Sequence, residues 1–100
     1  MKEIIAQINK VFENKTRLGV MSALMVNTSI DFTDLRDLLG ITDGNLASNI
    51  YLLERLKYLK VKKRIIARKM RTSYSITESG RRAFLEHLKA LESLIEGLNR

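Results

Sequence analysis

The sequence predicts a mainly helical α+β domain in which a single hairpin interrupts a series of helices. Apolar residues recur at helical spacing through most of the chain. Residues 60–77 differ, because β-branched and aromatic residues stand there on both sides of a basic connector, as in a two-stranded hairpin. A chain of 100 residues with 45% hydrophobic content is long enough for one domain with a single modest core.

The N-terminal third predicts two helices and a short strand. Segment 1–12 carries its apolar residues at the spacing of one helical face. A second helix is expected to be capped by Asn14 or Thr16 and to run to about Val26. Residues 30–32 then alternate briefly in polarity, which is enough for a short strand.

Residues 33–59 predict two helices joined by a short turn. The first helix, 33–39, is expected to end at Gly40, because glycine adopts the left-handed conformation common after a helix. Thr42 is placed to cap the second helix, 43–59. Three leucines of the first helix are expected to face inward: Leu35, Leu38 and Leu39. This spacing is typical of helix-turn-helix motifs, although ordinary helical hairpins share it.

The last elements are the hairpin of 60–77 and a long helix that starts at Thr77-Glu78 and runs to about Leu98. The predicted order is helix, helix, short strand, helix, helix, hairpin, helix. This is the order of a winged helix-turn-helix domain, with 33–59 as the helix-turn-helix and 60–77 as the wing.

The second helix of the motif separates into two faces. Leu46, Ile50 and Leu53 share one stripe with Lys57 at 100° per residue, so this stripe is expected to face the core. The opposite face carries short polar groups near its N-terminal half, where recognition helices touch base edges. The candidate major-groove residues are Thr42, Asn45, Ser48, Asn49, Tyr51 and Arg55. A merely solvated face is the alternative, but such faces are usually richer in Lys and Glu.

The positive charge of the chain is concentrated in one block. The formal net charge is +7, and residues 57–82 hold 10 basic residues and 1 acidic residue. A block of one sign inside a folded domain favours an anionic partner, nucleic acid above all. The candidate phosphate contacts in the wing are Lys62, Lys63, Arg64, Arg68, Lys69 and Arg71. Arg68 or Arg71 could also enter a narrow minor groove. A hairpin edge protected by lysines would explain only part of this charge.

The final helix carries a repeating apolar stripe. Its residues follow a 4-3-4-3 spacing, which is the seam of a helix that packs along another helix. The seam consists of Phe84, Leu88, Leu91, Ile95 and Leu98. Ile4 and Ile8 of a second chain would complement it, so segments 1–12 and 78–100 are expected to dimerise. The alternative is that the stripe covers the chain's own core.

Most enzymatic functions are excluded by composition. The chain has no cysteine, and its one histidine, His87, is expected at the surface, so no metal site or cofactor is predicted. No carboxylate pair or nucleophile–base set is present. The longest uncharged stretch, Leu18 to Ile30, is too short to span a bilayer, and no signal sequence is recognisable, so a cytoplasmic protein without a membrane partner is expected.

The stretch Thr42-Asp43-Gly44-Asn45-Leu46-Ala47-Ser48-Asn49-Ile50 resembles the "TDGNL" helix of small MarR-like winged-helix transcriptional regulators. Asn14 to Leu24 and Thr72 to Gly80 agree with the same family, and the similarity spans roughly residues 8–92. The resemblance implies operator binding as a homodimer, with the helix after "TD" in the major groove and the hairpin as a wing.

The sequence departs from the family pattern at four positions. Asn49 stands where these proteins often have His, and Lys57 where the helix often breaks at Gly. Ala67 and Met70 occupy wing positions that are commonly Gly and Pro.

Together these features predict sequence-specific binding to double-stranded DNA by a homodimeric transcriptional regulator without enzymatic activity. A winged-helix module that binds protein or RNA is the alternative, and charge alone does not separate DNA from RNA. The sequence does not give the operator, the sign of regulation or any small-molecule effector.

Overall fold

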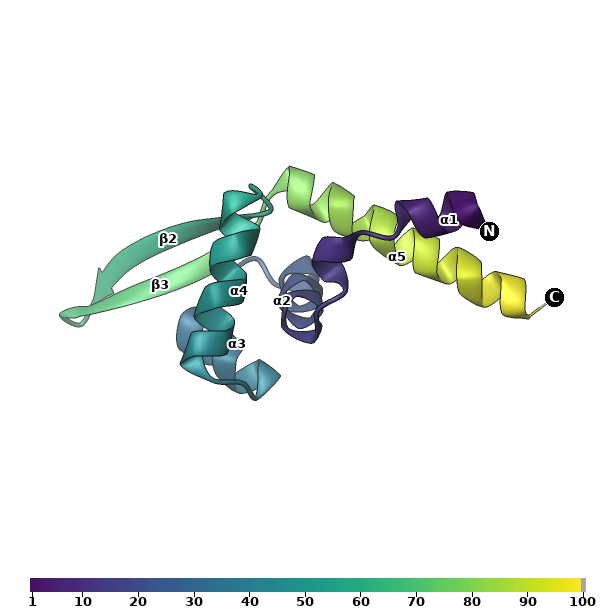
Figure 1. Ribbon diagram of the computed structural model, residues 1–100. Coiled ribbons are helices and arrows are strands. Elements are labelled where there is room, and N and C mark those ends of the chain that lie inside the picture. The colour runs from purple at the N-terminus through teal and green to yellow at the C-terminus, as the bar shows by residue number, and fades with distance from the viewer. Residues whose placement is uncertain (100) are drawn as a thin grey trace.

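A wing and a long helix leave a helical body in opposite directions (Figure 1). The computed structural model describes residues 1–99, so the last residue of the segment 78–100, Arg100, lies outside the described residues. The elements in chain order are α1 (Lys2–Gln7), the short 3-10 helix η1 (Lys10–Phe12), α2 (Lys15–Val26), β1 (Ile30–Asp31), α3 (Phe32–Leu39), α4 (Asp43–Arg55), β2 (Leu59–Ile66), β3 (Lys69–Ile76) and α5 (Glu78–Leu98). The predicted mainly helical winged helix-turn-helix is confirmed.

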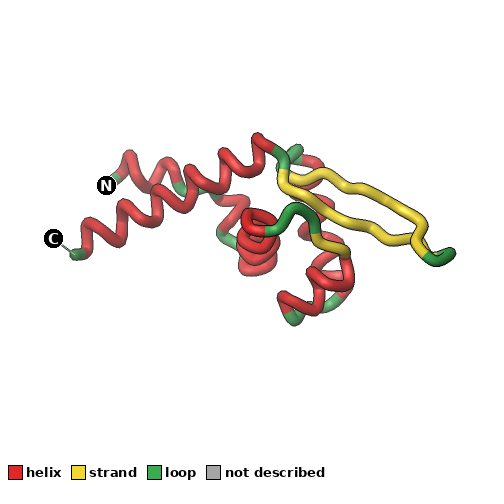
Figure 2. The backbone as a smooth tube through the Cα atoms, turned by 180° about the vertical axis from the view of Figure 1, so that it is seen from behind, coloured by secondary structure: helices red, strands yellow, loops and turns green. Residues whose placement is uncertain are grey.

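The sheet has three antiparallel strands in the order β1-β3-β2 (Figure 2). The wing strands pair without interruption from Leu59 opposite Ile76 to Ile66 opposite Lys69. β1 adds only two pairs, of which Ile30 opposite Tyr74 is one. The base of the wing is therefore joined to the helical body by β1, while its outer half extends beyond that body.

The core lies where α2, α4 and α5 meet. The predicted inward stripe of α4 is confirmed for Leu46, Ile50 and Leu53, each at most 2% exposed. Burial of each such side chain contributes about 1.5–3 kcal/mol. Their buried partners include Phe12, Val20, Met21, Leu24 and Phe84. This core fixes α4 against α2, so the outward face of α4 has a defined orientation.

Side-chain caps define where three helices begin. The Asn14 side chain accepts a hydrogen bond from Arg17 N, which decides between the two predicted caps of α2. Thr42 caps α4 by accepting from Asn45 N, as predicted. Thr77 likewise accepts from Gly80 N and starts α5. These bonds satisfy amide groups that the first turn of a helix leaves without partners.

Helix α4 ends earlier than the sequence predicts, at Arg55 and not near Leu59. Lys57 adopts the left-handed conformation with φ of 66°, which turns the chain into β2 and moves Lys57 off the inward stripe. Its amide donates to Glu54 O and the next amide, of Tyr58, donates to Leu53 O, so the carbonyls of the last turn are satisfied. Gly40, with φ of 64°, ends α3 by the same pattern, as predicted.

Three other expectations are wrong. Segment 1–12 is broken, because Ile8 is extended and Asn9 caps a separate 3-10 turn. Leu38 is 64% exposed, since the inner face of the short helix α3 is filled by Leu35 and Leu39. His87 is not at the surface: it is 2% exposed and packs against both Phe12 and Phe84.

Candidate nucleic-acid interface

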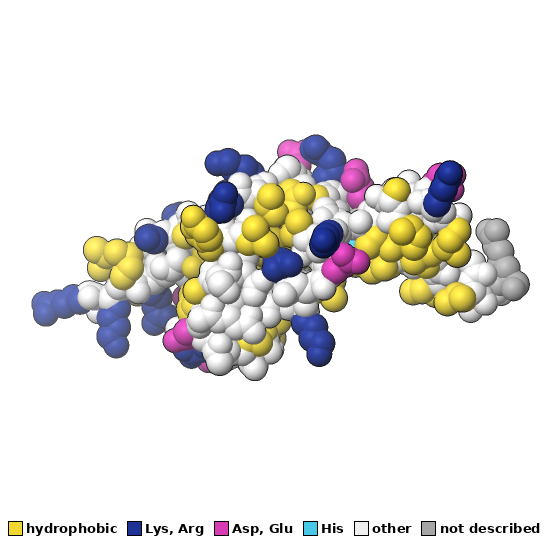
Figure 3. Space-filling view, in the orientation of Figure 1, with side chains coloured by type: hydrophobic (Ala, Val, Ile, Leu, Met, Phe, Trp, Pro, Cys, Tyr) yellow, Lys and Arg dark blue, Asp and Glu magenta, His cyan; other side chains and the backbone are white. Residues whose placement is uncertain are grey.

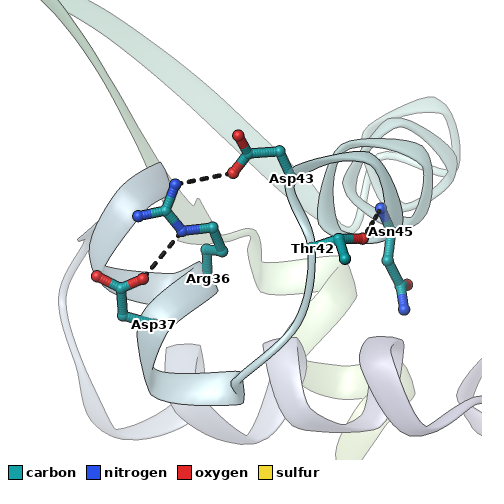
Figure 4. Close-up of polar contacts among 5 residues, drawn as sticks. All are labelled: Arg36, Asp37, Thr42, Asp43 and Asn45. Carbon is teal, nitrogen blue, oxygen red and sulfur yellow. Dashed lines mark hydrogen bonds and ion pairs between the residues drawn. The ribbon is translucent and has the colours of Figure 1, made fainter.

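The turn between α3 and α4 is held by one arginine. Arg36 Nε contacts Asp37 Oδ1 and its Nη1 contacts Asp43 Oδ1, both at 2.9 Å (Figure 4). The hydrogen bond to Asp37, followed by that to Asp43, raises the pKa of the Arg36 guanidinium above its ordinary value. Arg36 therefore links the end of α3 to the first turn of α4. Nothing in the sequence marks this residue, because only the folded turn brings Asp43 to it.

The outward face of α4 presents most of the residues predicted for the major groove. Thr42, Asn45, Ser48, Tyr51 and Arg55 are exposed, whereas Asn49 is half-buried. Tyr51 is 62% exposed, and the Arg55 guanidinium lies 5.8 Å from the centroid of its ring. Ser48 Oγ donates to the carbonyl oxygen of Asn45 at 3.2 Å. The exposed face thus combines short polar groups with one aromatic side chain.

Two of these residues are also bonded to α2. Thr16 Oγ1 donates to Asn45 Oδ1 at 3.0 Å, and Arg17 Nη1 donates to Asn49 Oδ1 at 2.7 Å. Asn49 Nδ2 in turn donates to Asn45 Oδ1 at 2.8 Å. Arg17 also donates from Nε to Val11 O at 2.6 Å, which holds its side chain in place. The sequence carried no signal for Thr16 or Arg17 as part of this surface, because both contacts cross between helices.

The six wing residues predicted to contact phosphate are all exposed. Because side chains alternate along a strand and directly paired residues share a face, the register assigns every strand residue of the wing to one of two faces. One face carries five cations: Lys60, Lys62, Arg64, Lys69 and Arg71. Arg71 Nη1 lies 3.5 Å from Asp31 Oδ2, which connects this face to β1. Figure 3 shows Lys and Arg side chains projecting from the wing.

Lys63 stands on the other face of the wing and interacts with α4. Burial raises the pKa of the Glu54 carboxyl, and the charge of Lys63 acts in the opposite direction. The same face carries Ile65 and Met70, which pair across the strands and are 73% and 62% exposed. The wing is thus basic on one face and partly apolar on the other.

The turn at the wing tip consists of Ala67 and Arg68. Both have positive φ, 50° and 65°, although neither is glycine. Two consecutive residues of positive φ are the pattern of the type I′ turn, whose twist matches that of the strands it joins. The tip therefore closes without Gly or Pro and places the Arg68 side chain at the far end of the wing.

The predicted dimer seam divides into buried and exposed parts. Phe84 is 1% exposed and packs edge-on against Phe12 of its own chain, at 5.1 Å between ring centroids. Ile4 and Ile8 are half-buried, and α1 packs along α5 of the same chain. Leu91 is half-buried, whereas Leu88, Ile95 and Leu98 are 37%, 58% and 84% exposed. Figure 3 shows the resulting apolar patch at the end of the molecule away from the wing.

Comparisons with known proteins agree with this geometry. The family model described as a winged helix DNA-binding domain matches residues 16–95, and the chain therefore belongs to this family. A transcriptional regulator homologue from Pyrococcus horikoshii has the same fold, with a TM-score of 0.86 and 34% identity over 99% of this chain and 96% of that one. An uncharacterized protein of Methanocaldococcus jannaschii is 28% identical over 89% of this chain and 97% of its own length.

More distant structures share the fold alone. BpsR of Bordetella bronchiseptica, whose DNA binding is regulated by 6-hydroxynicotinic acid, gives a TM-score of 0.72 at 18% identity over 96% of this chain and 75% of that one. The structural neighbours are MarR-family regulators, which confirms the resemblance found in the sequence. The family and fold are those of transcriptional regulators, not of enzymes. Among residues 1–99, no helix has the length and apolar character needed to cross a bilayer.

Proposed function

We propose that the protein binds double-stranded DNA sequence-specifically as a homodimeric transcriptional regulator. Helix α4 enters the major groove, and the wing contacts phosphates or the minor groove. The observation that carries the proposal is the five-cation face of the wing. The wing extends from the same helical body that exposes the polar face of α4. Phosphate contacts of this kind supply affinity, and base contacts from a helix supply specificity. This function implies a cytoplasmic protein.

The exposed part of α5 supports the dimer. Leu88, Ile95 and Leu98 form an apolar surface at the end opposite the wing, and apolar patches of this kind are typical of interfaces. A dimer would place two copies of α4 on one face of the duplex, about 34 Å apart, for a two-fold related site. Segments 1–12 and 78–100 are the proposed interface, with Phe84 as internal support.

The alternatives are a module that docks on protein and one that binds RNA. A surface that docks on protein would gain little from five cations on one wing face, so DNA is favoured over a protein partner. DNA is also favoured over RNA. The B-DNA major groove is wide enough to admit a helix such as α4, whereas side chains cannot read the deep, narrow major groove of A-form RNA.

Selection of bound sequences from random duplexes tests the proposal. We expect enrichment of a two-fold symmetric site, with half-sites about one helical turn apart. Competition with structured RNA of equal charge should not displace the selected duplex. Equal binding to all duplexes and to RNA would contradict sequence-specific DNA recognition.

A further inference from the structure

Arg17 determines which way two amide side chains of α4 point. A guanidinium group has only donors, so the atom of Asn49 that Arg17 Nη1 contacts at 2.7 Å must be its carbonyl oxygen. The Asn49 nitrogen then faces Asn45, where Nδ2 donates to Oδ1 at 2.8 Å and to the main-chain oxygen at 2.9 Å. The orientation of the Asn45 amide follows, because the atom that receives this bond must be its oxygen.

The Asn45 oxygen is fully used inside the protein. It accepts from Asn49 Nδ2 and from Thr16 Oγ1 at 3.0 Å, and an amide oxygen has two lone pairs. Asn45 Nδ2 has no hydrogen-bond partner among residues 1–99, and the residue is exposed near the start of α4. The side chain therefore offers solvent or a ligand two N–H donors and no acceptor.

We propose that Asn45 recognises guanine and not adenine, given that the protein binds DNA through α4 as proposed above. An asparagine that binds adenine in the major groove must accept from N6 while it donates to N7. The two bonds from Thr16 and Asn49 prevent this acceptance. Guanine presents two adjacent acceptors, N7 and O6, and these match an amide that can only donate. Thr16, Arg17 and Asn49 are then positioning residues that determine specificity without touching a base.

The test compares selected duplexes for the wild type and Asn45→Ala. We expect Asn45→Ala to relax preference at one position per half-site, and the wild type to hold a G·C pair there. Replacing that guanine by 7-deazaguanine, which lacks the N7 acceptor, should weaken wild-type binding about tenfold and leave Asn45→Ala unaffected. Asn45→Asp keeps the internal bonds and presents an oxygen in place of the free nitrogen, so it should favour the donor N4 of cytosine at the same position.

A second variant tests the positioning role. Thr16→Val removes one donor to Asn45 Oδ1 and frees a lone pair, so tolerance of adenine at the same position should rise severalfold. Ser22→Ala is the matched control, because Ser22 is an exposed α2 hydroxyl that bonds only to Leu18 O of its own helix. Thermal unfolding followed by circular dichroism verifies that each variant is folded.

The outcomes separate this inference from the proposed function. An A·T pair at the Asn45-dependent position, or no position relaxed by Asn45→Ala, would overturn the donor-only role while DNA binding itself stands. Failure of the wild type to enrich any duplex would overturn the proposed function, and the guanine assignment with it.

Discussion

The main-chain N–H of Asn9 donates a 3.0 Å hydrogen bond to Nδ1 of His87, a residue 78 positions further along the chain. This bond joins the break between α1 and η1 to the middle of α5. Since Nδ1 must be an acceptor, the imidazole is neutral and carries its proton on Nε2. A single histidine thus holds the N-terminal segment against the C-terminal helix.

This bond predicts a loss of stability in mild acid. Burial lowers the pKa of His87, and the smaller effect of the Glu13 charge opposes it. An unfolded histidine titrates near its ordinary value of about 6.5, so below that pH the unfolded state binds more protons than the folded state. The free energy of unfolding should therefore fall as the pH is lowered from 7.5 towards 5.5, as measured by urea denaturation. In His87→Gln, the stability should change little over that range; an unchanged slope would show that another group is responsible.

Lys57→Gly should stabilise the protein by about 1 kcal/mol. Lys57 has φ of 66°, a conformation that costs a side-chain-bearing residue about 1–2 kcal/mol and that glycine adopts freely. Equilibrium denaturation measures the change. Lys57→Ala is the matched control, because it removes the same charge and leaves the left-handed conformation strained. A gain of equal size in both variants would assign the effect to charge.

Removing two wing cations should reduce the salt dependence of DNA binding. Each neutralised phosphate contributes about 0.9 to the slope of log affinity against log salt concentration. The double variant Arg68→Ala, Lys69→Ala should therefore flatten the slope by about one to two units and weaken all duplexes similarly. An unchanged slope in the double variant would exclude the wing from the interface.

Ile95→Asp should convert the proposed dimer to a monomer. Ile95 is 58% exposed in the single chain, so the substitution leaves the core intact. In the dimer it buries a carboxylate in an apolar interface, and burying a charge that has no partner costs much free energy. Light scattering at tens of micromolar protein measures the mass. Val26→Asp, at a position 82% exposed on the end of α2, is the control for a surface carboxylate. A monomeric wild type would contradict the dimer and leave α5 as a cover for its own core.

The elements that the sequence predicts well are those with local signals. A single residue is enough to mark such a helix boundary. The structure places the helix starts at Thr42 and Thr77 and the helix end at the left-handed Gly40 as expected. For the end of α4 the one signal was the family resemblance, in which the helix often breaks at a glycine where Lys57 stands. Leu52, Leu56 and Leu59 continue a helical apolar pattern, so only the left-handed Lys57 shows that the last leucine already belongs to a strand.

The candidate site was predictable only in part. Exposure of the α4 residues follows from their position opposite Leu46, but the bonds from α2 to Asn45 and Asn49 depend on how two helices pack. His87 lies three residues after Phe84, on the buried side of α5. Its polar identity suggested the surface, and the amide of Asn9 that satisfies it is remote in sequence.

The elongated outline, with extents of 57 × 25 × 21 Å, separates the wing tip from the free end of α5 by nearly the whole molecule. Substitutions farther apart than about 7–10 Å usually have additive effects. Wing and α5 variants should therefore destabilise the single chain by no more than the sum of their separate effects. After a gene duplication, the wing and the α5 surface of one copy could then accumulate substitutions without one limiting what the other tolerates.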